Sequence, residues 1–153
     1  MNGSPNLCAF LDTIATSEIG ATLLAASDNG YNVLVGGMLF EGYDDHPRKL
    51  VWLPRLNISS TAAGRYQLLA RYFDSYKALL GLQDFSPASQ DAIAVQQIRE
   101  CRALPMVEAG DIVAALGRCA HIWASLPGAG YGQHENNLAG LETAYVNAGG
   151  VLA

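Results

Sequence analysis

Glu18 is the residue of this sequence whose type and position best suit proton-transfer chemistry. Apolar residues recur at helical spacing from Leu7 to Ile14, and Pro5 suits a first turn, so a helix is predicted that ends at Ser17 or Glu18. A carboxylate near a helix C-terminus faces the negative end of the dipole, and partial burial would add to that effect. Both favour a protonated acid near neutral pH, as a general acid requires. The alternative is a surface glutamate at a fraying helix end.

Two further segments have residue types that suit carbohydrate binding. Small residues from Ser60 to Gly64 let a backbone approach a ligand, and Tyr66 and Gln67 follow with an aromatic face and an amide. The alternative is a plain helix start with Tyr66 in the core. The glycine-rich loop 127–133 lacks the pattern of a phosphate loop, and we interpret it as a mobile lid.

Metal and serine-nucleophile chemistry find little support in the sequence. The run Asp44-Asp45-His46 has no second cluster to complete a metal site, so a solvated turn is the favoured interpretation. Ser59 and Ser60 do not stand in a nucleophile-elbow pattern. Three widely spaced cysteines predict buried, reduced thiols, at Cys8, Cys101 and Cys119. We therefore expect no metal and no cofactor.

Composition limits the class of protein and of partner. The chain has 153 residues, which predicts a single domain over 1–153. Its net charge of −5 argues against nucleic-acid binding. No apolar stretch reaches the roughly 18 residues of a membrane span, and the N-terminus lacks the pattern of a signal peptide. We therefore expect no stable membrane insertion.

The order of elements predicts a helical domain that carries one small sheet. We expect short strands at 32–35, 38–40, 50–53 and 57–61. After residue 62 the pattern is helical, and we expect helices over 66–80, 87–101, from Asp111, over 119–125 and over 135–148.

Short blocks spread over the whole chain resemble the bacteriophage lambda lysozyme (endolysin) family. They include AFLD and SE around Glu18, VGG at 35–37, DHPRKLV at 45–51, AGRYQLL ending at Leu69, and IWASLPGAGYGQ at 122–133. The resemblance implies an α+β, lysozyme-like fold, mostly helical, with one small antiparallel sheet flanking the active-site cleft. It also implies cleavage of the β-1,4 bond between N-acetylmuramic acid and N-acetylglucosamine by a lytic transglycosylase, which leaves a 1,6-anhydromuramic end.

The resemblance also implies roles for individual residues. Glu18 would be the catalytic acid. Asn32, Ser60, Gln67, Tyr131 and Gln133 would bind the saccharide, between lips formed by residues 49–58 and 126–137. Asn32 departs from the family pattern, which has an aspartate there, so hydrogen bonding is kept and a charge is lost.

The partners implied are peptidoglycan glycan strands and, for release, a holin. We expect a monomer that stays in the host bacterial cytoplasm until a holin pore lets it reach the periplasm and cell wall. Two alternatives stay open: a hydrolytic muramidase on the same fold, and a peptidoglycan-binding protein without catalysis, against which the retained Glu18 argues.

Overall fold

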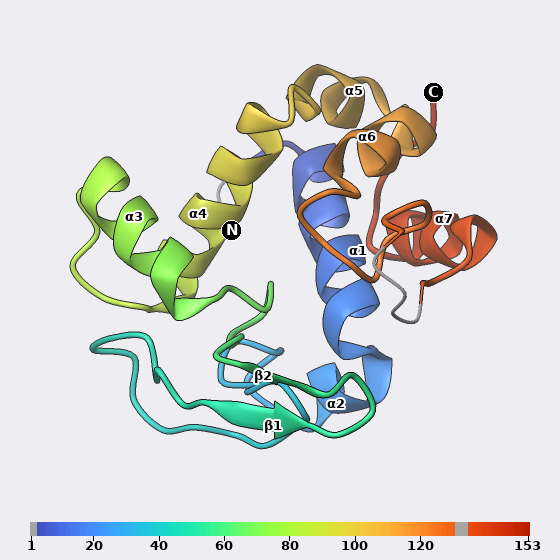
Figure 1. Ribbon diagram of the computed structural model, residues 1–153. Helices are drawn as coiled ribbons and strands as arrows, with labels where there is room; N and C mark the ends of the chain where they lie inside the picture. The colour runs from blue at the N-terminus through green and yellow to red at the C-terminus, as the bar shows by residue number, and fades with distance from the viewer. Residues whose placement is uncertain (1–2, 131–134) are drawn as a thin grey trace. The chain divides into compact units, whose positions relative to one another are not determined.

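The computed structural model describes residues 3–130 and 135–153 (Figure 1). Contacts divide the chain into two compact units: Met1–Glu18 with Ala94–Ala153, and Ile19–Ile93. We call the first the helical unit and the second the sheet unit. The chain passes from one to the other after Glu18 and again within α4, so the prediction of a single domain stays a prediction.

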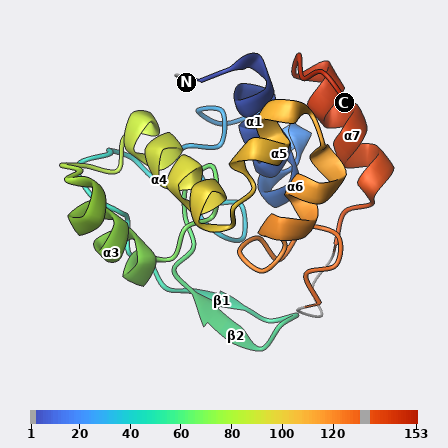
Figure 2. The same ribbon diagram turned by 90° about the horizontal axis from the view of Figure 1, so that it is seen from above.

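In the helical unit, short helices gather around one long helix. Figures 1 and 2 show α5, α6 and α7 around α1. The core includes Phe10 and Ile14 of α1, Leu116 of α6 and Tyr145 of α7, all fully or almost fully buried. The bounds of these helices are α1 Pro5–Ile19, α5 Leu104–Ala109, α6 Ile112–Cys119 and α7 Leu138–Asn147.

Side-chain caps explain where three of these helices begin. Before α1, Ser4 Oγ accepts a hydrogen bond from the Leu7 N–H at 3.1 Å. Asp111 caps α6 through the Ala114 N–H at 3.1 Å, and Asn137 caps α7 through the Gly140 N–H at 2.8 Å. The predictions for α1 and α6 are confirmed. The last helix begins three residues later than predicted, because Asn137 is its cap.

One prediction for the helical unit was wrong, and one helix was missed. Residues 120–125 form turns rather than a helix. The sequence pattern also did not indicate α5, which starts with Pro105 near its N-terminus and ends at Gly110, where φ is 78°.

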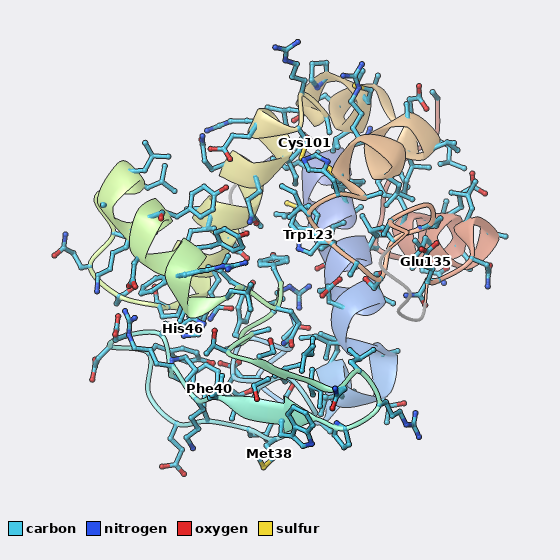
Figure 3. All side chains as sticks on the ribbon, in the orientation of Figure 1. Met38, Phe40, His46, Cys101, Trp123 and Glu135 are labelled. Carbon is cyan, nitrogen blue, oxygen red and sulfur yellow. The ribbon has the colours of Figure 1, made fainter. Side chains whose placement is uncertain are left out.

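The sheet unit contains a two-stranded antiparallel sheet, two helices and the first half of a third. Trp52 of β1 pairs with Ser59 of β2. The core of this unit is aromatic, and Phe73 lies edge-on to Phe85 with 5.0 Å between ring centroids. Figure 3 labels Phe40 and His46, which belong to the same buried region. The bounds are α2 Ala21–Ala25, β1 Val51–Leu53, β2 Ile58–Ser60, α3 Ala70–Leu80 and α4 Pro87–Glu100.

The predicted strands and helix around residues 32–69 are partly wrong. Strands 32–35 and 38–40 reduce to two isolated bridges, Val33 with Leu39 and Leu34 with Ala63. The helix predicted from residue 66 begins only at Ala70. Gly64 and Gln67 have φ values of 80° and 50°, which no right-handed helix accepts, and they form a turn instead. The pairs at 50–53 and 57–61 are confirmed as β1 and β2.

The element content agrees with the predicted α+β class, mostly helical with one small antiparallel sheet. Of the described residues, none belongs to a helix that is both long and apolar enough to cross a membrane.

Candidate functional site

Glu18 lies in the last turn of α1, with a side chain that is only partly exposed. Ser125, far along the chain, donates a hydrogen bond from its hydroxyl to Glu18 Oε1 at 2.5 Å. The neighbours Trp123 and Leu126 are buried in the helical unit, and they fix the turn that carries Ser125. The site therefore depends on a contact between the first helix and a turn that follows α6.

Burial raises the pKa of the Glu18 carboxyl, and hydrogen bonds from the Ser125 hydroxyl and backbone oppose it without cancelling it. A carboxyl of this kind keeps its proton to a higher pH than an exposed glutamate does. The sequence argument predicted this property and placed the helix dipole first, whereas burial is the main cause. The alternative of a surface glutamate at a fraying end is wrong, because the side chain is held and desolvated.

Two more polar side chains extend the Glu18 contact. Ser17 Oγ lies 2.8 Å from Ser125 Oγ. Asn136 Nδ2 donates to the Ser17 hydroxyl at 3.0 Å, to the Ser17 carbonyl at 3.1 Å and to the Ser125 carbonyl at 3.3 Å. Its backbone N–H donates to the same Ser125 carbonyl at 2.8 Å. We call Ser17, Ser125 and Asn136 the relay.

The loop that follows Leu126 is shaped by another carboxylate. Glu135, labelled in Figure 3, accepts hydrogen bonds from the Gly128 and Gly130 N–H groups, both at 2.8 Å. These two bonds lower the pKa of Glu135, because they favour its charged form. The next residues are Asn136 of the relay and the cap of α7, so three successive side chains anchor this end of the loop.

The relay and Glu135 were not singled out from the sequence. Ser17 and Ser125 stand in the quoted blocks SE and IWASLPGAGYGQ, but nothing local distinguishes them from other serines. Ser125 is 107 residues from Glu18, so only the tertiary fold joins them.

In the sheet unit, three predicted saccharide-binding residues hold turns of the backbone. Asn32 Oδ1 accepts from the Asp28 N–H at 2.9 Å, and Ser60 Oγ accepts from the Ala62 N–H at 3.1 Å. Gln67 Nε2 donates to the Gly64 carbonyl at 2.9 Å. Each is partly exposed, so each keeps polar surface for a ligand. Tyr131 and Gln133, the other two, lie outside the described residues.

A buried arginine holds together the segment that carries Gln67. Arg65 is 1% exposed, and its guanidinium carbon lies 5.2 Å and 5.9 Å from the ring centroids of Tyr31 and Tyr66. Both tyrosine hydroxyls donate to Asp91 Oδ1, at 2.9 Å and 2.7 Å. Gln90 Oε1 accepts from the Arg65 N–H at 2.9 Å. Tyr66 thus belongs to the core, as one interpretation held, but in a turn rather than at a helix start.

The solvated turn expected at Asp44-Asp45-His46 is confirmed for the two aspartates, which are exposed in a bend, but not for His46, which is 2% exposed. His46 Nε2 bonds the Leu68 carbonyl at 2.9 Å, while Nδ1 accepts from the Arg48 N–H at 3.0 Å. Asp45 forms an exposed ion pair with Arg48 at 2.7 Å. No group of three His, Cys, Asp or Glu side chains suited to a metal occurs in residues 3–130 and 135–153.

The prediction of three buried, reduced cysteines is confirmed in part. Cys101 and Cys119 are buried free thiols, whereas Cys8 is partly exposed.

Comparison with known proteins identifies the family. A family model described as Endolysin matches residues 8–152. The chain belongs to the endolysin family. It is 56% identical to the endolysin of Escherichia phage lambda over 146 residues, which covers 94% of this chain and 91% of that protein. It is 46% identical to the endolysin of Escherichia phage P2 over 162 residues, which covers 100% of this chain and 98% of that protein.

Solved structures of bacteriophage lambda lysozyme share the fold. One, complexed with a chitohexasaccharide, has a TM-score of 0.94 at 50% identity, covering 100% of this chain and 99% of that one. Another has a TM-score of 0.88 at 51% identity, with the same coverage. The lysozyme-like fold is therefore confirmed, and this endolysin is a peptidoglycan-cleaving enzyme of the lambda lysozyme type.

Proposed function

We propose that this endolysin is a lytic transglycosylase that uses Glu18 alone, first as acid and then as base. It cleaves the β-1,4 bond between N-acetylmuramic acid and N-acetylglucosamine and leaves a 1,6-anhydromuramic end. The observation that carries the proposal is Glu18 itself: a desolvated carboxyl with a raised pKa, held by the Ser125 hydroxyl.

The reaction balances with one carboxyl and no water. The Glu18 carboxyl gives its proton to the glycosidic oxygen as the bond from that oxygen to the muramic C1 breaks. The 6-hydroxyl oxygen of the same sugar forms a bond to C1, and its proton passes to the Glu18 carboxylate. The acid is thereby regenerated. Because the nucleophile is tethered to the reacting sugar, its effective concentration is high without a bound water.

The surroundings of Glu18 support a mechanism with one carboxyl. Glycosidases usually pair two carboxylates, one as acid and the other as base or nucleophile. In the described part of the helical unit, the hydrogen-bond network of Glu18 consists of serine and asparagine groups. Glu135 is engaged elsewhere by two glycine N–H groups.

The proposal includes glycan strands as the substrate. The lambda lysozyme structure complexed with a chitohexasaccharide supports binding of a β-1,4-linked amino sugar chain by this fold. We assign saccharide contacts to Asn32, Ser60 and Gln67, because each is partly exposed and carries an amide or hydroxyl on a fixed turn. Tyr131 and Gln133 are assigned by family resemblance alone.

The physiological role that we propose is host lysis by a monomeric enzyme. It would be made in the bacterial cytoplasm and reach the cell wall through a holin pore. The endolysin relatives of phages lambda and P2 support the lytic role. Expression in Escherichia coli with and without a separate pore-forming protein tests this. We expect lysis only when the pore is present, and lysis without it would contradict the proposed route.

The catalytic assignment is tested by clearing of permeabilised Gram-negative cells. We expect Glu18→Gln to abolish clearing while the circular dichroism spectrum stays that of the parent. Clearing by Glu18→Gln at the parent rate would refute the assignment. A parent protein that binds cell walls without clearing them would support the alternative of an inactive binding protein.

A hydrolytic muramidase is the second candidate, since the solved relatives carry the name lysozyme. The two reactions differ in the product end. We expect mass spectrometry of digested peptidoglycan to show anhydromuramic ends, which are lighter by one water than reducing ends. Reducing ends in their place would favour the muramidase.

A further inference from the structure

The hydrogen bonds of the relay have a direction that can be read from the donors. Asn136 Nδ2 faces the carbonyl oxygens of Ser17 and Ser125, so the amide nitrogen, which only donates, occupies this position. The Ser17 hydroxyl therefore accepts from Asn136. The Ser125 hydroxyl gives its single proton to Glu18 Oε1, so it must accept from Ser17. The two hydroxyl protons of the relay thus point towards Glu18.

This direction decides where Glu18 carries its own proton. A proton on Oε1 would face the proton of the Ser125 hydroxyl. To avoid that, Ser125 would have to donate to Ser17. The Ser17 hydroxyl would then accept from both Ser125 and Asn136, and its own proton would lose its acceptor in the relay, because Asn136 Nδ2 cannot accept. Reversal of the relay is therefore disfavoured, because it costs the Ser17 proton its hydrogen bond, and Oε2 is the oxygen favoured for the proton of Glu18.

We propose that Ser125 is a positioning residue for catalysis: with Ser17 and Asn136 it keeps Oε1 as an acceptor and so assigns the transferable proton to Oε2. This inference rests on the proposed role of Glu18 as acid and base. Ser125 acts through Glu18 and needs no contact with the substrate. When the proton of Glu18 stays on one oxygen, the acid is oriented for proton transfer before the reaction begins. Such orientation contributes to general acid catalysis.

The relay is held rigidly enough for this role. Ser17 is buried on α1, directly before Glu18. Asn136 is tied by its side chain to two carbonyls and by its backbone N–H to Ser125. Chains of hydrogen bonds of one direction polarise one another, so each donor strengthens the next. The bond that reaches Glu18 is the last of this chain.

Ser125 also shifts the proton affinity of Glu18 in a direction that can be measured. Its hydrogen bonds lower the pKa of Glu18 and so oppose the effect of burial. The ionisable described groups on neighbouring elements include Asp12 of α1, Arg118 of α6, His121 of the turn after α6, Glu135 of the loop, and Glu142 and Tyr145 of α7. None of these is among the causes of the Glu18 pKa. Loss of the Ser125 hydroxyl should therefore raise the pKa of Glu18 further.

The test combines a titration with kinetics on four variants of the full chain. The titration follows the carboxyl carbon of Glu18 by NMR in protein with labelled glutamate, with Glu18→Gln identifying the resonance. We expect Ser125→Ala to move the midpoint to higher pH and Ser17→Ala to move it less, in the same direction. Ser125→Thr keeps the hydroxyl and should restore the parent midpoint. Ser75→Ala removes an exposed hydroxyl of the sheet unit and is the matched control.

The effects of the substitutions on kcat should follow the same order as their effects on the Glu18 titration midpoint. We expect Ser125→Ala to lower kcat by roughly 10- to 100-fold with little change in KM, and to move the alkaline limb of the kcat profile to higher pH. Ser75→Ala should match the parent. The titration does not depend on the product, so it still decides the role of Ser125 if reducing ends show the proposed reaction to be wrong.

An unchanged Glu18 midpoint in Ser125→Ala would overturn the proposal. If Ser125→Ala does not fold, as judged by near-ultraviolet circular dichroism, Ser17→Ala decides, since it removes the donor to Ser125 and leaves the turn intact. An unshifted midpoint and an unchanged kcat in that variant would equally overturn it.

Discussion

The relay around Glu18 and the network around Arg65 are two sets of buried polar groups. They differ in the charged or ionisable group that they hold and in how they hold it. In the helical unit, three neutral side chains form a line of donors that ends on one partly exposed carboxyl. In the sheet unit, Arg65 lies between two tyrosine rings whose hydroxyls both reach Asp91, and Gln90 joins the same network to the backbone.

This difference between the two networks indicates a different role for each. A line of donors that ends on a desolvated carboxyl can hold a proton in one place and release it, so it suits catalysis. A network that surrounds a fully buried cation with two aromatic rings, both tied to one carboxylate, fixes the backbone around it, here the turn that carries Gln67. We therefore expect substitutions in the first to affect the reaction and substitutions in the second to affect the free energy of unfolding.

The largest expected effect is that of Glu18→Gln on the rate. Removal of a general acid costs about 10²- to 10⁴-fold in kcat, and the amide cannot supply the proton. The urea midpoint at pH 7 should not fall, because the substituted amide is uncharged in a desolvated position. A rate within tenfold of the parent, or a large loss of stability, would show that the Glu18 network is structural like that of Arg65.

Arg65→Ala should have the largest effect on stability. It removes a fully buried side chain and leaves the Asn29 carbonyl without its donor, so we expect a loss of about 3 kcal/mol or more in urea denaturation. Arg99→Ala, at an exposed position of α4, is the matched control and should change stability little. Near-parent stability of Arg65→Ala would remove the scaffold role.

A smaller effect is the pH dependence that Glu18 adds to stability. Its pKa is raised in the folded state by burial, so the folded protein holds the proton more tightly than the unfolded chain does. The contribution is present below the unfolded value of 4.5 and is lost as pH rises through the folded pKa. Relative to the parent, Glu18→Gln should therefore gain stability between pH 4 and pH 7. If urea denaturation gave the same difference in the free energy of unfolding between parent and Glu18→Gln at every pH, that would contradict this prediction.

The smallest predicted effect concerns His46 in the sheet unit. Burial lowers its pKa, and protonation of Nδ1 would break the hydrogen bond from the Arg48 N–H. The folded pKa lies below 6.5, so this contribution is present above pH 6.5 and is lost as pH falls towards the folded value. His46→Gln can keep a donor and an acceptor without titrating. Between pH 7 and pH 5 we expect the free energy of unfolding of that variant to change less with pH than that of the parent. Equal slopes in the two proteins would refute the predicted role of His46.

The sequence predicted the elements whose ends have local signals. Pro5, Asp111 and the Ser86-Pro87 pair mark helix starts that the structure confirms. It failed between residues 62 and 69, because the helical spacing there does not reveal that Gly64 and Gln67 adopt positive φ. That conformation is supported by contacts with distant residues, including the hydrogen bond from the Gly64 N–H to the Val33 carbonyl at 2.8 Å.

Of the hydrogen-bond network around Glu18, the sequence singled out only Glu18 itself. Its helix-end position left a surface glutamate as an alternative, and the family blocks favoured the acid. Ser125 and Asn136 were not predictable in the same way, since serine and asparagine are common in turns and their role depends on partners more than 100 residues away. Their direction towards Glu18 is a property of the folded network and has no local signature.

Digestion of peptidoglycan in oxygen-18 water tests the central claim most directly. If Glu18 works alone and the muramic 6-hydroxyl is the nucleophile, no water enters the product. We predict anhydromuramic ends without the heavy oxygen from the parent enzyme, and no products from Glu18→Gln. Reducing muramic ends that carry the heavy oxygen would contradict the account, because they require water as the nucleophile.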